Sequence, residues 1–317
     1  MRKVIYQSFS KLGGDRLMWA IRSRRLSILC YHGICEDRLA AEAWVPGYFV
    51  AESAFERQLR YLQRSACVLA LSEAVARLAD GSLPPRSVSI TFDDGYANNL
   101  SLAYPLLEKY QMPATVFLSS AYIESGDMYP FLKLHLIRLS GVTGGSRAPS
   151  YKSDPIDVVV QWSGCWWSGV EKGLTGDQRS TLRPLTIGEV ETADSRLIEF
   201  GAHSHTHCIL KNERRERRQE EIRSSIDKVA HWTGRPVRLF SYPNGELGDF
   251  GAVDKEELRA KGIQAAVTGI GGANGRSADM LELKRYPVGL YHDSAGFQAE
   301  VTGFRSAVLA ASKGLAS

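Results

Sequence analysis

The sequence predicts an α/β fold whose strands run parallel to one another, in a sheet or a barrel. Short apolar segments alternate along the chain with segments of helical period, and this alternation is typical of such folds. Two of the apolar segments end in reactive side chains, His32 and the adjacent pair Asp93 and Asp94. With 317 residues, of which 44% are hydrophobic and 23% charged, the chain is long enough for one large α/β domain or two small ones, and a single domain is expected.

The first expected elements are a strand followed by two helices. Residues 26–32 form a buried apolar strand that ends in a histidine and a glycine. A helix is expected at 53–62 because its apolar side chains recur at helical spacing, and Ser53 and Glu56 fit a capping box at its start. A shorter helix is expected at 72–79, before a turn into the next strand.

From residue 89 onward the alternation continues, is interrupted once and then resumes. The interruption at 124–185 is interpreted as an insertion, and its tryptophans at 161–167 are expected to pin it to the host domain rather than to stack on sugar rings. The other expected elements are a strand at 89–92, a helix with Leu102, Leu106 and Leu107 on one face, strands at 113–118, 197–200, 237–242, 265–268 and 283–288, a charged helix at 211–221, and a terminal helix with Phe297, Val301, Phe304 and Val308.

Charge and cysteine content exclude some classes of partner and site. The net charge of +4 is too small to indicate nucleic-acid binding, and the sign-alternating segment 211–221 fits a solvated helix face. Five scattered cysteines, without CxxC spacing, suggest neither a disulfide framework nor a thiolate zinc site. We therefore expect buried free thiols and no nucleic-acid partner.

Residues 1–25 are expected to form a basic, amphipathic N-terminal segment ahead of a main domain at 26–300 and a C-terminal helix or tail at 301–317. The segment fits a helix on an anionic membrane surface, and it equally fits a helix packed on the main domain. An export signal and an apolar run of transmembrane length are both missing from the sequence. The expected location is cytoplasmic, with peripheral contact to the inner face of the membrane as an addition.

The segment Ser89-Ile-Thr-Phe-Asp-Asp-Gly-Tyr96 places two carboxylates at the end of an apolar strand. Carboxylates are rarely buried without a cation, hydrogen-bond donors or a shared proton. Downstream, Phe200-Gly-Ala-His-Ser-His-Thr-His207 places three histidines within five residues. His203 and His207 share a face on a helical turn, and an extended strand adds His205 to that face. Two imidazoles and one carboxylate, with open positions for water, are the pattern of a catalytic metal site.

Together with the segment Phe240-Ser-Tyr-Pro-Asn-Gly245, these two motifs resemble those of the polysaccharide deacetylase family, also called NodB-homology proteins or family 4 carbohydrate esterases. The order and approximate separation of the three motifs also fit, and the resemblance covers roughly residues 26–300. It implies a distorted (β/α) barrel of the deacetylase type with an insertion around 124–185. It also implies a metal-dependent hydrolase that removes N-acetyl groups from amino-sugar units of a polysaccharide or its precursor. Because the sequence shows no export signal, the preferred hypothesis is a cytoplasmic step in the synthesis of a surface or extracellular polysaccharide.

The resemblance also assigns roles to individual residues. Asp94, His203 and His207 would bind a divalent metal, with zinc preferred and cobalt, nickel or manganese as alternatives, and Asp93 would be the general base. The main-chain amide of Asn244 would stabilise the oxyanion. An N-acetylated glycan would be the substrate, and its candidate contacts are Tyr96, Tyr242, Pro243, Arg285 and His292.

The sequence departs from the family pattern in two places. Many relatives have an arginine where this chain has Ser241, so Arg285 is the candidate to orient Asp93 instead. The usual Asp-Trp element is absent, and the late Leu-x-His element is reduced to Leu290-Tyr-His292. His32 and His292 therefore compete for the role of general acid, and we favour His32 because of its position at a strand end.

Three other interpretations of the sequence remain open. Two histidines and one carboxylate also bind ferrous iron in oxygenases, but the adjacent Asp93 and the lack of a 2-oxo-acid-binding arginine motif argue against that class. The same fold could carry a small-molecule amidohydrolase. The missing Asp-Trp element leaves room for a catalytically impaired glycan-binding protein.

Overall fold

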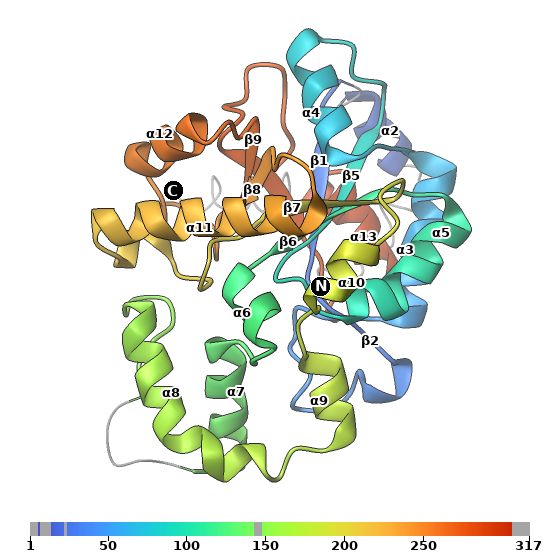
Figure 1. The fold of residues 1–317 in the computed structure, drawn as a ribbon. Coiled ribbons are helices and arrows are strands. Elements are labelled where there is room, and N and C mark those ends of the chain that lie inside the picture. The colour runs from blue at the N-terminus through green and yellow to red at the C-terminus, as the bar shows by residue number, and fades with distance from the viewer. Residues whose placement is uncertain (1–5, 7–13, 22–23, 143–147, 306–317) are drawn as a thin grey trace, which may run out of the picture.

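The computed structural model describes Tyr6 and residues 14–21, 24–142 and 148–305. Within these residues, seven parallel strands close into a barrel with helices around it (Figure 1). The strand order is β1, β10, β9, β8, β7, β6 and β5, and the pairing of β5 with β1 closes the barrel. The strands are β1 (Ser27–Tyr31), β5 (Ser87–Phe92), β6 (Ala114–Leu118), β7 (Ile198–Ala202), β8 (Leu239–Ser241), β9 (Ala265–Gly271) and β10 (Leu283–Pro287). The predicted barrel is confirmed.

Burial explains why these segments are strands. Every side chain of β1, β5 and β6 is buried, as expected for parallel strands covered on both faces. A short strand, β4 (Cys67–Val68), pairs with the first residues of β5, and β2 (Ile34–Cys35) pairs with β3 (Val50–Ala51) outside the barrel.

Helices surround the barrel on its outer side (Figure 1). They are α2 (Gly14–Ile21), α3 (Glu52–Ser65), α4 (Leu71–Asp80), α5 (Tyr104–Tyr110), α6 (Ser120–Ser125), α10 (Ile187–Thr192), α11 (Arg215–Thr233), α12 (Ala252–Ala260) and α13 (Ser294–Val301). Short helical turns lie at η1 (Asp37–Leu39), η2 (Asn99–Ala103) and η3 (Leu210–Asn212).

Two local expectations need correction. The capping box is wrong, because α3 begins at Glu52 without a side-chain cap and the Ser53 hydroxyl donates to the Asp37 carboxylate at 2.6 Å. The charged helix begins at Arg215 rather than at 211. Helix α12 was not expected from the sequence.

Between β6 and β7, three helices form a separate group below the barrel in Figure 1. They are α7 (Pro130–Ser140), α8 (Ile156–Glu171) and α9 (Gly176–Leu182). Trp167 is buried in a cluster with side chains of α7, and the Lys133 ammonium lies 5.4 Å from its ring centre. Trp162 and Trp166 are partly buried against the same cluster. Trp167 is thus packed within the insertion, and the expectation that these rings pin the insertion to the host domain stays a prediction.

The two ends of the chain are described only in part. In α2, Trp19 is buried in the main core, whereas Leu17 and Ile21 are exposed. Most of the predicted segments at 1–25 and 301–317 lie outside the described residues. Among the helices that the structure describes, none is long and apolar enough to cross a bilayer.

Candidate metal centre and active site

Asp93 and Asp94 follow β5 directly and lie in a sharp turn. Asp94 and Gly95 both adopt left-handed backbone conformations, with φ of 72° and 73°. A Cβ atom at Gly95 would come within 2.5 Å of the Leu118 side chain, so the turn requires glycine at that position. The turn leaves both carboxylates buried at the carboxyl edge of the barrel.

His203 and His207 follow β7 and reach the same edge. Strands β5 and β7 both pair in parallel with β6, so they end on the same side of the barrel. The Nε2 atoms of His203 and His207 lie 3.5 Å and 2.9 Å from Asp94 Oδ1. The structure therefore brings together the three predicted metal ligands, with ligand atoms all within 4.8 Å of one another.

Hydrogen bonding fixes the orientation of the His203 ring. His203 Nδ1 lies 2.7 Å from the main-chain oxygen of Ser241, which can only accept, so the ring proton is on Nδ1. In the neutral ring, the Nε2 lone pair then faces the Asp94 carboxylate. Asp94 Oδ1 is buried and has no hydrogen-bond donor in the described part of the chain. A lone pair opposite a carboxylate is repulsive, and a cation between them relieves the repulsion, so these residues fit a divalent metal.

Electrostatics keep Asp94 ionised. Burial raises the pKa of Asp94, but His207, His203 and His32 together lower it more, so it lies well below its ordinary value. A negatively charged oxygen beside two imidazole nitrogens is a donor set that zinc accepts.

Asp93 is held by a different set of contacts. Arg285, from β10, donates from Nη1 to Asp93 Oδ1 at 2.7 Å and from Nη2 to Oδ2 at 2.6 Å. The Ser241 hydroxyl donates to Oδ2 at 3.2 Å and the Cys30 thiol at 3.6 Å. Burial raises the pKa of Asp93, but Arg285 and the nearby histidines more than offset this, and the net pKa lies below its ordinary value.

Arg285 is itself fully engaged. Its other hydrogen bonds go to the Thr268 main-chain oxygen at 2.8 Å, the Thr91 hydroxyl at 3.3 Å and the Ser241 hydroxyl at 3.0 Å. All five guanidinium donors therefore have acceptors, and the fork is fixed against Asp93. The hypothesis that Arg285 orients Asp93 agrees with this geometry, and its effect on catalysis stays a prediction.

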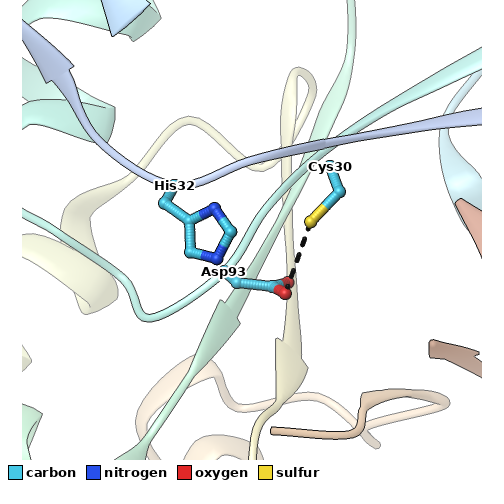
Figure 2. Close-up of side chains that lie close together, drawn as sticks. All are labelled: Cys30, His32 and Asp93. Atoms are coloured by element: carbon cyan, nitrogen blue, oxygen red, sulfur yellow. Dashed lines mark hydrogen bonds between the residues drawn. The ribbon is translucent and has the colours of Figure 1, made fainter. Parts of the chain in front are cut away.

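Figure 2 shows a second group of potential ligands, Cys30, His32 and Asp93. Both oxygens of Asp93 already accept from the Arg285 guanidinium, and its positive charge disfavours a cation there. Burial also raises the pKa of the Cys30 thiol far above its ordinary value, so it stays protonated. This second group does not fit a metal.

The two candidates for general acid have different surroundings. His32 lies beside Asp93 (Figure 2), and its buried Nδ1 has no hydrogen-bond partner among the residues described. His292 Nδ1 instead accepts from the Gly289 main-chain amide at 3.2 Å, and its Nε2 lies 3.0 Å from Arg305 Nη1. The geometry thus places His32 at the site and gives His292 other partners.

The remaining predicted residues have mixed positions. Tyr242 is buried, with its ring stacked on Phe250 and its hydroxyl bonded to the Leu281 main-chain oxygen at 3.0 Å. Tyr96 is also buried, and its hydroxyl is 3.4 Å from that of Tyr48. Both side chains are thus packed in the core, and their predicted role in binding substrate stays a prediction.

Asn244 follows Pro243 in the turn after β8 and has a φ of 58°. Its side-chain amide donates to Asp249 at 2.5 Å, and the Glu246 main-chain amide donates to the same carboxylate at 2.8 Å. These bonds fix the shape of the turn. The predicted roles of the Asn244 main-chain amide and of Pro243 stay predictions.

Three tyrosines at the site are not predicted from the sequence. The Tyr129 hydroxyl donates to the Asp94 main-chain oxygen, the Tyr151 hydroxyl contacts His207, and the Tyr48 ring lies 4.8 Å from the His32 ring. Tyr129 and Tyr151 lie in the insertion, where no strand pattern indicates which side chains face the barrel. No signal in the sequence identifies them.

A parallel barrel with this donor set and a separate ionised aspartate defines a candidate metal-dependent hydrolase. Residues 80–266, more than half of the chain, match the family described as Polysaccharide deacetylase. The chain belongs to the polysaccharide deacetylase family.

Relatives of known name are similar to part of the chain. The poly-beta-1,6-N-acetyl-D-glucosamine N-deacetylase of Staphylococcus aureus is 38% identical over 80 residues, which are 25% of this chain and 28% of the relative. The protein of that name from Staphylococcus epidermidis is 34% identical over 92 residues, which are 29% of this chain and 32% of that relative. The aligned segments thus span about a third or less of these relatives.

Solved structures match over most of the chain and support the fold. The Streptococcus pyogenes deacetylase PplD, in complex with acetate, has a TM-score of 0.62 at 17% identity. The match covers 88% of this chain and 99% of the PplD chain. IcaB from Ammonifex degensii has a TM-score of 0.61 at 19% identity, with 88% of this chain and 97% of its own covered.

Proposed function

We propose that this chain is a metal-dependent hydrolase that removes N-acetyl groups from amino-sugar units of a glycan. The observation that carries the proposal is that a set of three metal ligands and a separate ionised carboxylate lie together at one edge of the barrel. Asp94, His203 and His207 converge on a common point, while Asp93 is held next to them by Arg285 and stays ionised. A hydrolytic metal site needs both a ligand set and a separate base.

Zinc is the proposed metal, because two imidazole nitrogens and one carboxylate oxygen with an open position form a catalytic zinc site. Cobalt, nickel and manganese are compatible with the same ligands. The bound ion would polarise the acetyl carbonyl and lower the pKa of the attacking water.

Asp93 is assigned as the general base. Its Oδ2 accepts hydrogen bonds from Arg285 Nη2, the Ser241 hydroxyl and the Cys30 thiol. Among the described donors, only Arg285 Nη1 donates to its Oδ1. Oδ1 is therefore the oxygen with free acceptor capacity for the proton of the attacking water. The Arg285 fork holds that oxygen in one orientation, which is how a positioned base gains efficiency.

His32 is assigned to deliver a proton to the leaving amine. Burial lowers the pKa of His32 below its ordinary value, although Asp94 and Asp93 oppose this. The ring is therefore neutral near pH 7 and can take up the proton that Asp93 withdraws from water. The Asn244 main-chain amide is assigned to the oxyanion.

The proposed substrate is a β-1,6-linked polymer or oligomer of N-acetylglucosamine. Its support is the similarity to the staphylococcal proteins, whose names state that substrate. The products would be acetate and a free amino sugar.

Acetate release from N-acetylated β-1,6-glucosamine oligomers tests the proposal. We expect release that stops after treatment with a chelator and returns when Zn²⁺ is added. Release from monomeric N-acetyl compounds but not from oligomers would favour a small-molecule amidohydrolase. Oligomer binding without any release, in the presence of Zn²⁺, would favour a glycan-binding protein and contradict the proposed activity.

A further inference from the structure

Tyr151 lies in the connection between α7 and α8 and reaches across to the metal ligand His207. Its hydroxyl is hydrogen bonded both to His207 Nδ1 and to the main-chain oxygen of His207. The two rings are stacked, with their centres 5.7 Å apart and an angle of 26° between their planes. Phe131, also from the insertion, packs against both rings, with its ring centre 4.9 Å from that of His207 and 5.5 Å from that of Tyr151.

These two hydrogen bonds determine which nitrogen of His207 carries the proton. A main-chain oxygen only accepts, so the single hydroxyl proton of Tyr151 is used there. The contact with His207 Nδ1 is then a hydrogen bond only if Nδ1–H is the donor and the hydroxyl oxygen accepts. This leaves the lone pair on Nε2, the nitrogen that lies 2.9 Å from Asp94 Oδ1.

We propose that Tyr151 is a positioning residue that holds His207 in the Nδ1-protonated tautomer and thereby makes metal binding depend on the insertion. The inference rests on the metal site of the proposed function. Metal-bound histidines usually donate their other ring N–H to an acceptor, and loss of that acceptor typically weakens metal binding about 10–100-fold. For His203 the acceptor is the main-chain oxygen of Ser241, from the barrel itself. For His207 it is a side chain, which a mutation can remove.

The first test is the affinity of the metal-free protein for Zn²⁺ alone, measured by competition with a chromophoric chelator. Tyr151→Phe keeps the stacked ring and removes the hydroxyl, and we expect it to bind Zn²⁺ about 10–100-fold more weakly than the wild type. Tyr31→Phe is the matched control, because Tyr31 is a buried tyrosine whose hydroxyl donates to Gln58 at 2.8 Å. Its Zn²⁺ affinity should be unchanged. Equal affinity of Tyr151→Phe and the wild type would overturn the inference.

The second test does not depend on a variant that folds or on turnover. Long-range ¹H–¹⁵N correlation spectra of the metal-free wild-type protein distinguish the two neutral tautomers of histidine. We expect His207 to carry its proton on Nδ1, and a proton on Nε2 would contradict the inference. Since this spectrum involves neither metal nor substrate, a failed acetate assay with an Nδ1-protonated His207 would count against the proposed function alone.

Discussion

The barrel and the insertion hold their parts of the site in different ways. In the barrel, Asp93 receives hydrogen bonds from Arg285, Ser241 and Cys30, which belong to three different strands. From the insertion, one hydroxyl of Tyr151 contacts His207 and one hydroxyl of Tyr129 contacts the main chain of Asp94. The proposed base is thus fixed by several strand-borne contacts, whereas the metal ligands also depend on single side chains from outside the barrel.

The largest expected effect is a loss of acetate release when the proposed base in the barrel is removed. Asp93→Asn removes the proposed base, and acetate release should fall by about 10²–10⁴-fold, the usual contribution of general-base catalysis. Zn²⁺ binding should be retained, because Asp94, and not Asp93, belongs to the ligand set that converges on a common point. Parallel assays of acetate release and Zn²⁺ content check both expectations. Wild-type release by Asp93→Asn would refute the assignment.

Arg285→Met tests whether the contact between Arg285 and Asp93 stabilises the folded protein as well as orienting the proposed base. The substitution leaves a buried carboxylate without its cation, which should lower the free energy of unfolding by about 3–5 kcal/mol. Denaturant unfolding measures the change. The double variant Asp93→Asn with Arg285→Met should lose less stability than the sum of the two single variants, because the pair is in direct contact.

Arg285→Lys is the matched control for charge. It keeps a cation but cannot form the two parallel bonds of the guanidinium fork. We expect it to be more stable than Arg285→Met and still slower than the wild type in acetate release. If Arg285→Lys released acetate at the wild-type rate, orientation by the fork would be unnecessary.

The smallest expected effect is a loss of stability when one hydrogen bond from the insertion is removed. Tyr129→Phe removes one buried hydrogen bond to the Asp94 main-chain oxygen, and the expected loss is about 1 kcal/mol in the free energy of unfolding. Tyr122→Phe is a suitable comparison, because the Tyr122 hydroxyl donates to another main-chain oxygen, that of Thr206, at 3.1 Å. If only Tyr129→Phe also weakens Zn²⁺ binding, its contact shapes the ligand turn. If neither variant weakens Zn²⁺ binding, the insertion's influence on the metal is limited to Tyr151.

The sequence predicts the barrel part of the site because strands are recognised from local, periodic patterns of apolar residues. Asp93 and Asp94 follow β5, His203 follows β7, and parallel strands bring their carboxyl ends to one edge. Arg285 is a candidate only through the family resemblance, whose motif implies an arginine at the position of Ser241. The structure shows that the two positions are adjacent, with the Arg285 guanidinium 3.0 Å from the Ser241 hydroxyl.

The insertion part of the site was not predictable in the same way. Tyr151 lies 56 residues from His207 in the sequence, in a connection without helical or strand period, so no pattern predicts that they meet. The capping box failed for a related reason, because Ser53 has a tertiary partner, Asp37, that competes with the local cap. Contacts between distant irregular segments depend on the whole fold.

The most direct test of the central claim is anomalous diffraction at the zinc absorption edge, from crystals of the wild-type protein grown with Zn²⁺. We predict one strong peak about 2.0–2.2 Å from Asp94 Oδ1, His203 Nε2 and His207 Nε2. A peak between Cys30, His32 and Asp93 instead, or no peak next to Asp94, would contradict the claim that these three residues hold the hydrolytic metal.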